Sequence, residues 1–120
     1  MELNEYQRKA MSTMIDSCNN DTYMFFGLVS EVGELCEKIA KWRRKRFASI
    51  DGNMVILNTF DTAEVERNRA ELMRELGDVL WFVAGLANRM DFSLEEVAQT
   101  NIDKLSQRKQ NGTIVTHTDH

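Results

Sequence analysis

Four acidic side chains occur in two pairs with helical spacing, and their chemistry is that of divalent-cation ligands. The pairs are Glu31 with Glu34 and Glu75 with Asp78. Residues three apart are neighbours on a helix surface, so each pair presents two carboxylates on one face. A solvated charged face is enough to explain a single pair of this kind. The repetition of the pair supports a second hypothesis, that the two helices share a metal site.

The residues around the pairs favour this second hypothesis. Gly33 and Gly77 lie within the pairs, and glycine inside a helix costs about 1 kcal/mol relative to alanine, so we expect close helix packing there. Carboxylates that face one another inside a bundle need a compensating charge. Ligands that are all oxygen favour Mg²⁺, with Mn²⁺ as the alternative. Because Mg²⁺ commonly binds substrate phosphates as well, we expect a phosphorylated substrate.

Apolar periodicity and capping signals predict the helices that carry these acids. Asn4 with Gln7 and Ser93 with Glu96 have capping-box spacing, and apolar residues recur every three or four positions in between. The predicted helices span residues 4–17, 22–47, 62–90 and 93–110. Four amphipathic helices in this length predict an all-α fold of the four-helix-bundle type.

The apolar stripes of the two long helices are predicted to face the core. Cys36 is expected to be a small buried residue of the first stripe. The first stripe comprises Phe25, Leu28, Val29, Val32, Cys36, Ile39 and Ala40, and the second Leu72, Leu76, Val79, Leu80, Val83, Leu86 and Ala87. Residues 48–61 are expected to form an inserted loop or flap, in which 54–57 fit a short strand, a flap or a helix extension. Residues 111–120 are expected to be an irregular tail.

Size and composition limit the class of protein. A chain of 120 residues fits one domain, residues 1–120, and a net charge of −4 argues against a nucleic-acid polymer as partner. The N-terminus does not resemble a secretory signal, and the longest apolar run is too short to cross a membrane. Cys18 and Cys36 suggest neither a disulfide framework nor a zinc site. We therefore expect a cytoplasmic protein.

Basic and amide side chains near the acids are candidates for substrate binding. Lys38 and Lys41 follow Glu34 by one and two helical turns; Lys38 either pairs with Glu34 or meets the substrate phosphates. In the last helix, three polar residues continue an apolar stripe, so they either leave the core or line a pocket; these are Asn101, Lys104 and Arg108. Five aromatic residues are candidates for stacking on a base, although core positions are the commoner role; they are Tyr6, Phe26, Trp42, Trp81 and Phe82.

The ordered set of motifs resembles the MazG-like all-α nucleoside triphosphate pyrophosphohydrolases. The resemblance rests on the opening segment 4–7, the paired acids, the segment 75–82, and the pattern from Ser93 to Arg108. It implies a dimer or tetramer with sites built by two subunits. It also implies that divalent metal is held by the four acids and that cleavage occurs between the α- and β-phosphates. The stretch 35–74 is longer than in compact members of the family, which leaves specificity and assembly open.

These observations lead to one expected function. The chain is predicted to be a Mg²⁺-dependent nucleoside triphosphate pyrophosphohydrolase of the nucleotide pool, in which Glu34, or else Glu31, orients or deprotonates the attacking water. A dUTP or phosphoribosyl-ATP pyrophosphohydrolase of the same fold is the alternative within enzymes. A non-catalytic, metal-binding helical module is the alternative outside them.

Overall fold

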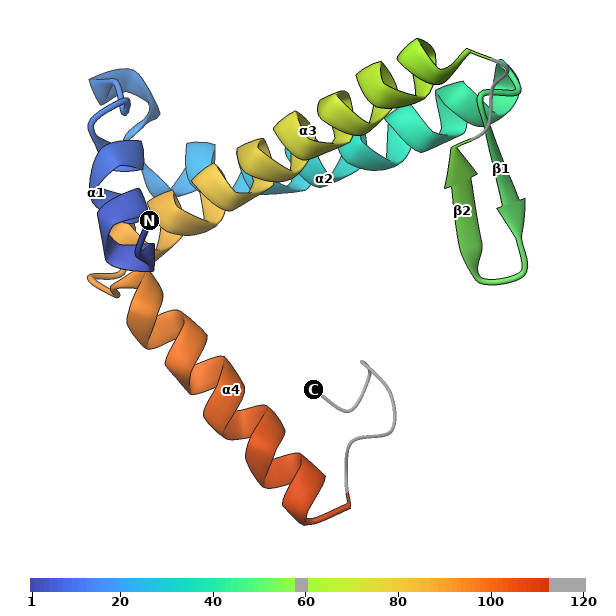
Figure 1. The fold of residues 1–120 in the computed structure, drawn as a ribbon. Coiled ribbons are helices and arrows are strands. Elements are labelled where there is room, and N and C mark those ends of the chain that lie inside the picture. Colours follow the sequence, from blue (N-terminus) through green and yellow to red (C-terminus); the bar gives the residue numbers. More distant parts are fainter. Residues whose placement is uncertain (58–60, 113–120) are drawn as a thin grey trace.

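The computed structural model describes residues 1–57 and 61–112, and its elements are mostly helical (Figure 1). The predicted helices 62–90 and 93–110 agree closely with the structure. The predicted helix 22–47 ends earlier, at Arg44, and the predicted helix 4–17 ends at Met11 and is followed by a separate 3-10 turn. The elements are α1 (Leu3–Met11), η1 (Asp16–Cys18), α2 (Asp21–Arg44), β1 (Ala48–Asp51), β2 (Met54–Leu57), α3 (Thr62–Arg89) and α4 (Leu94–Gln110).

Helices α2 and α3 run side by side and antiparallel, and they form the long arm of the molecule (Figure 1). Each begins at a side-chain cap: Asn20 Oδ1 accepts from the Tyr23 amide at 2.8 Å, and Asp61 Oδ1 accepts from the Ala63 amide at 2.9 Å. The side of α2 that is least exposed advances in alternate steps of four and three residues, as in a coiled coil. Its positions are Met24, Leu28, Glu31, Leu35, Lys38 and Trp42.

This seam corrects the predicted core face of α2. The predicted stripe lies largely outside the seam: Val29 is 70% exposed, Phe25 is 52% exposed, and Cys36 is exposed rather than buried. Apolar periodicity selected the wrong face because the true seam carries charged residues, Glu31 and Lys38, among its apolar ones. The face of α2 that packs against α3 therefore includes Glu31, whereas Glu34 and much of the apolar surface of α2 point outward.

Close approach of the two helices occurs at glycines other than the predicted ones. A Cβ at Gly27 would overlap the ring of Phe82, and one at Gly85 would press on the sulfur of Met24. At Gly33 and Gly77 a Cβ would meet no atom of the described residues within 4 Å. The prediction that Gly33 and Gly77 mark close packing within the protomer was wrong.

The first turn of α1 links three helices rather than forming a capping box. Gln7 is buried; its Nε2 donates to the carbonyls of Phe92 at 3.0 Å and Ala84 at 3.3 Å, and its Oε1 accepts from the Leu94 amide at 3.0 Å. Asn4 Oδ1 likewise accepts from the amide of Glu95. The predicted Asn4–Gln7 box is therefore wrong, because both side chains cap α4 instead. Ser93 does cap α4, through the Glu96 amide at 3.1 Å.

The remaining elements modify the all-α prediction. Strands β1 and β2 form an antiparallel hairpin, which decides between the three alternatives for residues 54–57 in favour of a strand. Residues 58–60 of the predicted insert and 113–120 of the predicted tail lie outside the described residues. Helix α4 packs on α1 and α3 through its first turns and then diverges from the α2–α3 arm (Figure 1). None of the described helices is both long and apolar enough to cross a membrane.

Candidate functional site

The seam between α2 and α3 brings together carboxylates from both predicted pairs. One oxygen each of Glu31, Glu34 and Glu75 can be chosen so that all lie within 4.8 Å of one another. Glu31 Oε2 and Glu75 Oε2 are buried without a hydrogen-bond partner among the described residues. Buried carboxylate oxygens without donors are unfavourable. Their arrangement, with oxygen as the only ligand type, fits a divalent cation.

The fourth predicted acid, Asp78, lies beside this group of three. It is exposed on α3, and its charge acts on Glu31. The pKa of Glu31 is raised, first by burial and then by the charges of Glu34 and Asp78, a hydrogen bond with Glu34 and the charge of Glu75. The other three predicted acids therefore all act on this one carboxyl group. Asp78 also raises the pKa of Tyr6 in α1, after the effect of burial.

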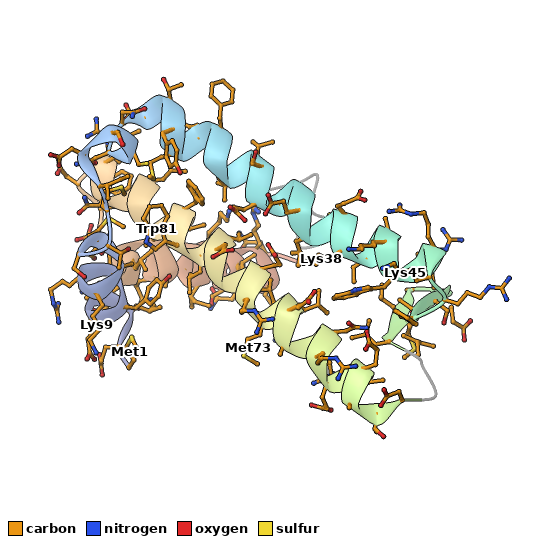
Figure 2. All side chains as sticks on the ribbon, turned by 90° about the horizontal axis from the view of Figure 1, so that it is seen from above. Met1, Lys9, Lys38, Lys45, Met73 and Trp81 are labelled. Atoms are coloured by element: carbon orange, nitrogen blue, oxygen red, sulfur yellow. The ribbon has the colours of Figure 1, made fainter. Side chains whose placement is uncertain are left out.

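Lys38 is the cation at the other end of the acidic cluster. Its Nζ donates to Glu71 Oε2 at 3.2 Å and lies 3.8 Å from Glu75 Oε1. Figure 2 shows Lys38 on the side of α2 that faces α3. The predicted ion pair between Lys38 and Glu34 within α2 is therefore wrong, because the Lys38 side chain reaches across to the acids of α3. Glu71 was not among the predicted site residues, although it precedes Glu75 by one helical turn.

A depression of about 240 Å³ opens beside Lys38 and is mostly charged. It is lined by Glu34, Glu37, Lys38, Lys41 and Glu75. Lys38 is half-buried in its ion pairs, whereas Lys41 is exposed. We call this hollow the cationic depression. In it, both predicted lysines lie next to the acids.

A second hollow, of about 410 Å³, adjoins the acids toward the N-terminal end of α2, and three of its lining residues are aromatic. We call it the aromatic recess; it is lined by Thr22, Tyr23, Phe26, Gly27, Ser30, Glu31, Glu34 and Phe82. Two of the five aromatic candidates, Phe26 and Phe82, line it. Tyr23 was missed, although it lies one helical turn before Phe26. Its ring centroid is 5.8 Å from that of Phe82.

Two of the other aromatic candidates are structural. Trp81 Nε1 donates to Thr13 Oγ1 at 2.9 Å and to the Ala10 carbonyl at 3.2 Å, and Trp81 packs on the small core around Ala84. Trp42 is 5% exposed at the far end of the seam. Both therefore fit the core role, which is the commoner one for aromatic residues on helices.

The predicted substrate residues of α4 are not brought to the acids of the same protomer. Asn101, Lys104 and Arg108 lie in the part of α4 that diverges from α2 and α3 (Figure 1). Asn101 and Lys104 are exposed. Leu94, at the start of the helix, is the buried residue of α4 among those described. If these three side chains act on a substrate, they act at a site other than that of their own protomer.

Comparison with known proteins gives two matches and one negative result. Residues 20–113 match the family described as the MazG nucleotide pyrophosphohydrolase domain. The chain is also 37% identical over 121 residues to the Gene 37 protein of Mycobacterium phage L5, covering 95% of this chain and 94% of that protein. No solved structure matches the chain significantly. The family match spans all four predicted acids.

Proposed function

Since this chain belongs to the MazG nucleotide pyrophosphohydrolase family, we propose that it hydrolyses a nucleoside triphosphate to the monophosphate and pyrophosphate. The observation that carries the proposal is the convergence of Glu31, Glu34 and Glu75 from two helices. Paired carboxylates with donor-free oxygens suit a site that handles metal and phosphate together. A solvated acidic face would not bury such oxygens in a helix seam.

In this proposal, Glu31, Glu34, Glu75 and Asp78 hold Mg²⁺, with Mn²⁺ as an alternative. When bound, the cation offsets the negative charge of the phosphates and makes water a better nucleophile. The buried oxygens of Glu31 and Glu75 support the assignment, because a cation would supply the partner that they lack. The charge of Asp78 acts on Glu31, which supports its membership in the set.

Glu34, the exposed member of the three converging carboxylates, is suited to proton transfer. It lines both the cationic depression and the aromatic recess, so one of its oxygens is accessible to water between them. We assign it the proton from the water that attacks the α-phosphorus, with Glu31 as its hydrogen-bonded neighbour. The bond from the α-phosphorus to the bridging oxygen breaks, and pyrophosphate leaves towards Lys38 and Lys41.

The surface of the protomer supports assembly into a dimer or tetramer. Its accessible surface is 8878 Å², whereas a globular monomer of its mass is expected to expose about 6,700 Å². Large apolar residues are exposed on the outer faces of both long helices: Phe25, Val29, Val32, Met73, Leu76 and Leu80. Figure 2 shows Met73 on the side of α3 that faces away from α2. In such an assembly, the diverging end of α4 would bring Asn101, Lys104 and Arg108 to the acids of another subunit.

Product analysis across a nucleotide panel tests the activity. The purified protein is incubated with Mg²⁺ and each common ribo- and deoxyribonucleoside triphosphate, including dUTP, and with phosphoribosyl-ATP; the products are separated by ion-exchange chromatography. We expect monophosphate and pyrophosphate from at least one substrate. Release of diphosphate and orthophosphate, or no release from any substrate, would contradict the proposal, and the latter result would favour a non-catalytic helical module.

Two variants test the roles of the acids in the same assay. Glu34→Gln and Asp78→Asn remove one negative charge each with little change of shape, and both should abolish pyrophosphate release while leaving the helical circular dichroism unchanged. Glu66→Gln is the matched control, because Glu66 is an exposed glutamate on α3 outside the cluster. Normal turnover by the first two variants would refute the assignment.

A further inference from the structure

The two hollows beside the acidic cluster differ in chemistry. The cationic depression is lined by Lys38 and Lys41 beside three glutamates, whereas the aromatic recess contains Tyr23, Phe26 and Phe82. Glu34 lines both of them, so each hollow adjoins the acidic cluster, one toward the C-terminal part of α2 and the other toward its N-terminal part. A nucleotide has the same polarity, with an anionic end and an aromatic end separated by the sugar and the α-phosphate.

The aromatic recess has the size and surface of a site for a flat apolar ligand. Its volume of about 410 Å³ lies within the usual range for small-molecule pockets. Phe26 is 71% exposed, so the face of its ring is accessible, while Phe82 is buried behind it. Hydroxyl groups of Thr22 and Ser30 border the recess and can exchange hydrogen bonds with the polar edge of a ligand.

The local packing holds the back of the recess in place. The absence of a side chain at Gly27 lets the ring of Phe82 lie directly against α2. On its other side this ring meets Trp81 in an edge-to-face contact, with centroids 5.1 Å apart and planes at 82°. Trp81 is fixed by its hydrogen bond to Thr13. The recess is therefore backed by a rigid aromatic surface.

We propose that the aromatic recess binds the nucleobase of the substrate and that Phe26 is its stacking residue. This inference rests on the proposed function. It orients the nucleotide along α2, with the base near the N-terminal end and the β- and γ-phosphates in the cationic depression. The α-phosphate then lies over Glu31, Glu34 and Glu75, which explains why the bond between the α- and β-phosphates would be the one attacked.

Binding of non-hydrolysable ligands tests this orientation without requiring turnover. Dissociation constants are measured by titration calorimetry with Mg²⁺ for the α,β-methylene triphosphates of the common bases and for inorganic tripolyphosphate. The proteins are the wild type, Phe26→Ala, Phe26→Tyr and a control, Phe92→Ala. Phe92 is also an exposed phenylalanine, at 53%, but it lies outside the recess.

We expect Phe26→Ala to weaken binding of at least one nucleotide analogue by between about 5- and 150-fold, the range for loss of one stacked base. Tripolyphosphate binding should not change, and Phe26→Tyr should bind like the wild type. Equal weakening for tripolyphosphate and nucleotide, no weakening for any analogue, or no binding of any analogue by the wild type would overturn the inference. Intact analogue binding without hydrolysis of true substrates would refute the proposed function alone.

Discussion

Glu31 is the most constrained acidic side chain of the α2–α3 seam. One of its oxygens is buried without a hydrogen-bond partner in the described part of the chain, and three other acids act on it. Without a cation, this carboxyl group therefore holds its proton more strongly in the folded chain than in the unfolded chain. Its protonation consequently links the stability of the metal-free fold to pH.

The first prediction follows from the raised pKa of Glu31. Because the pKa of Glu31 is higher in the folded than in the unfolded chain, its protonation stabilises the fold. This contribution is complete below the unfolded-state pKa and is lost as the pH rises through the folded-state pKa. In EDTA, raising the pH from about 5 to 7 should therefore lower the melting temperature of the wild type more than that of Glu31→Gln. Circular dichroism melts at a series of pH values measure this difference, and parallel curves for the two proteins would contradict it.

At the scale of elements, α2 and α3 are in closest contact where glycine permits it. Phe82 lies against the backbone of α2 at Gly27, and Met24 lies against α3 at Gly85. These contacts fix the separation of the helices on the side of the acids nearer to α1. That separation in turn sets how far the carboxylates of α2 lie from those of α3.

A pair of substitutions in α2 tests this packing. Gly27→Ala should destabilise the protein by about 1–3 kcal/mol, because the added methyl group overlaps the Phe82 ring. Gly33→Ala, in the same helix but in open space within the protomer, should be stabilising by about 0.5–1 kcal/mol, because alanine favours helix. Urea denaturation measures both free energies of unfolding. Equal effects of the two substitutions would contradict the assignment of close contact to Gly27.

Gln7 is the polar residue that joins α1 to the start of α4. Gln7→Ala removes three hydrogen bonds and leaves the Leu94 amide and two carbonyls without this partner. A buried polar group without a partner costs about 1–3 kcal/mol. The variant should therefore lose at least the cost of one such group in its free energy of unfolding. Gln107→Ala, an exposed glutamine in α4, is the control. Urea denaturation in which the two variants behave alike would refute the role of Gln7.

The whole protomer is extended and has a small core. Its radius of gyration is 17.5 Å, whereas a compact chain of this length is expected to have about 13.6 Å. Met24 is the large side chain that the described residues bury completely. Such a protomer has little apolar burial of its own to oppose the entropy of folding, which supports the proposal that other subunits cover its outer helix faces.

Complementation tests whether the sites are shared between subunits. Glu34→Gln and Lys104→Ala should each be inactive, but mixed oligomers formed by denaturing and refolding the two together should recover about a quarter of wild-type activity, if each site takes acids from one subunit and Lys104 from the other. Pyrophosphate release measures the recovery, and sedimentation verifies the oligomeric state. No recovery from an efficiently mixed oligomer, or a monomeric wild type, would contradict shared sites.

The sequence by itself determined the family and most of the helices. Spacing of three residues, which needs no tertiary information, placed Glu31 with Glu34 and Glu75 with Asp78 on shared faces. The cap at Ser93 was also predicted from local residue order, and the structure confirmed it. The family resemblance came from the order of the motifs, and the family match confirmed it. The strand at 54–57 stayed open, because a short apolar run fits a strand or a helix equally well.

Tertiary structure alone decided which faces meet. Apolar periodicity favoured the stripe of Phe25 and Val29, yet the seam runs through Glu31 and Lys38. The reason is physical: Lys38 is held in the seam by Glu71 and Glu75 of the other helix, and one helix's sequence does not reveal what lies opposite. The same holds for Gln7, whose partners are 77 or more residues away, and for Gly27, whose role depends on a ring carried by α3.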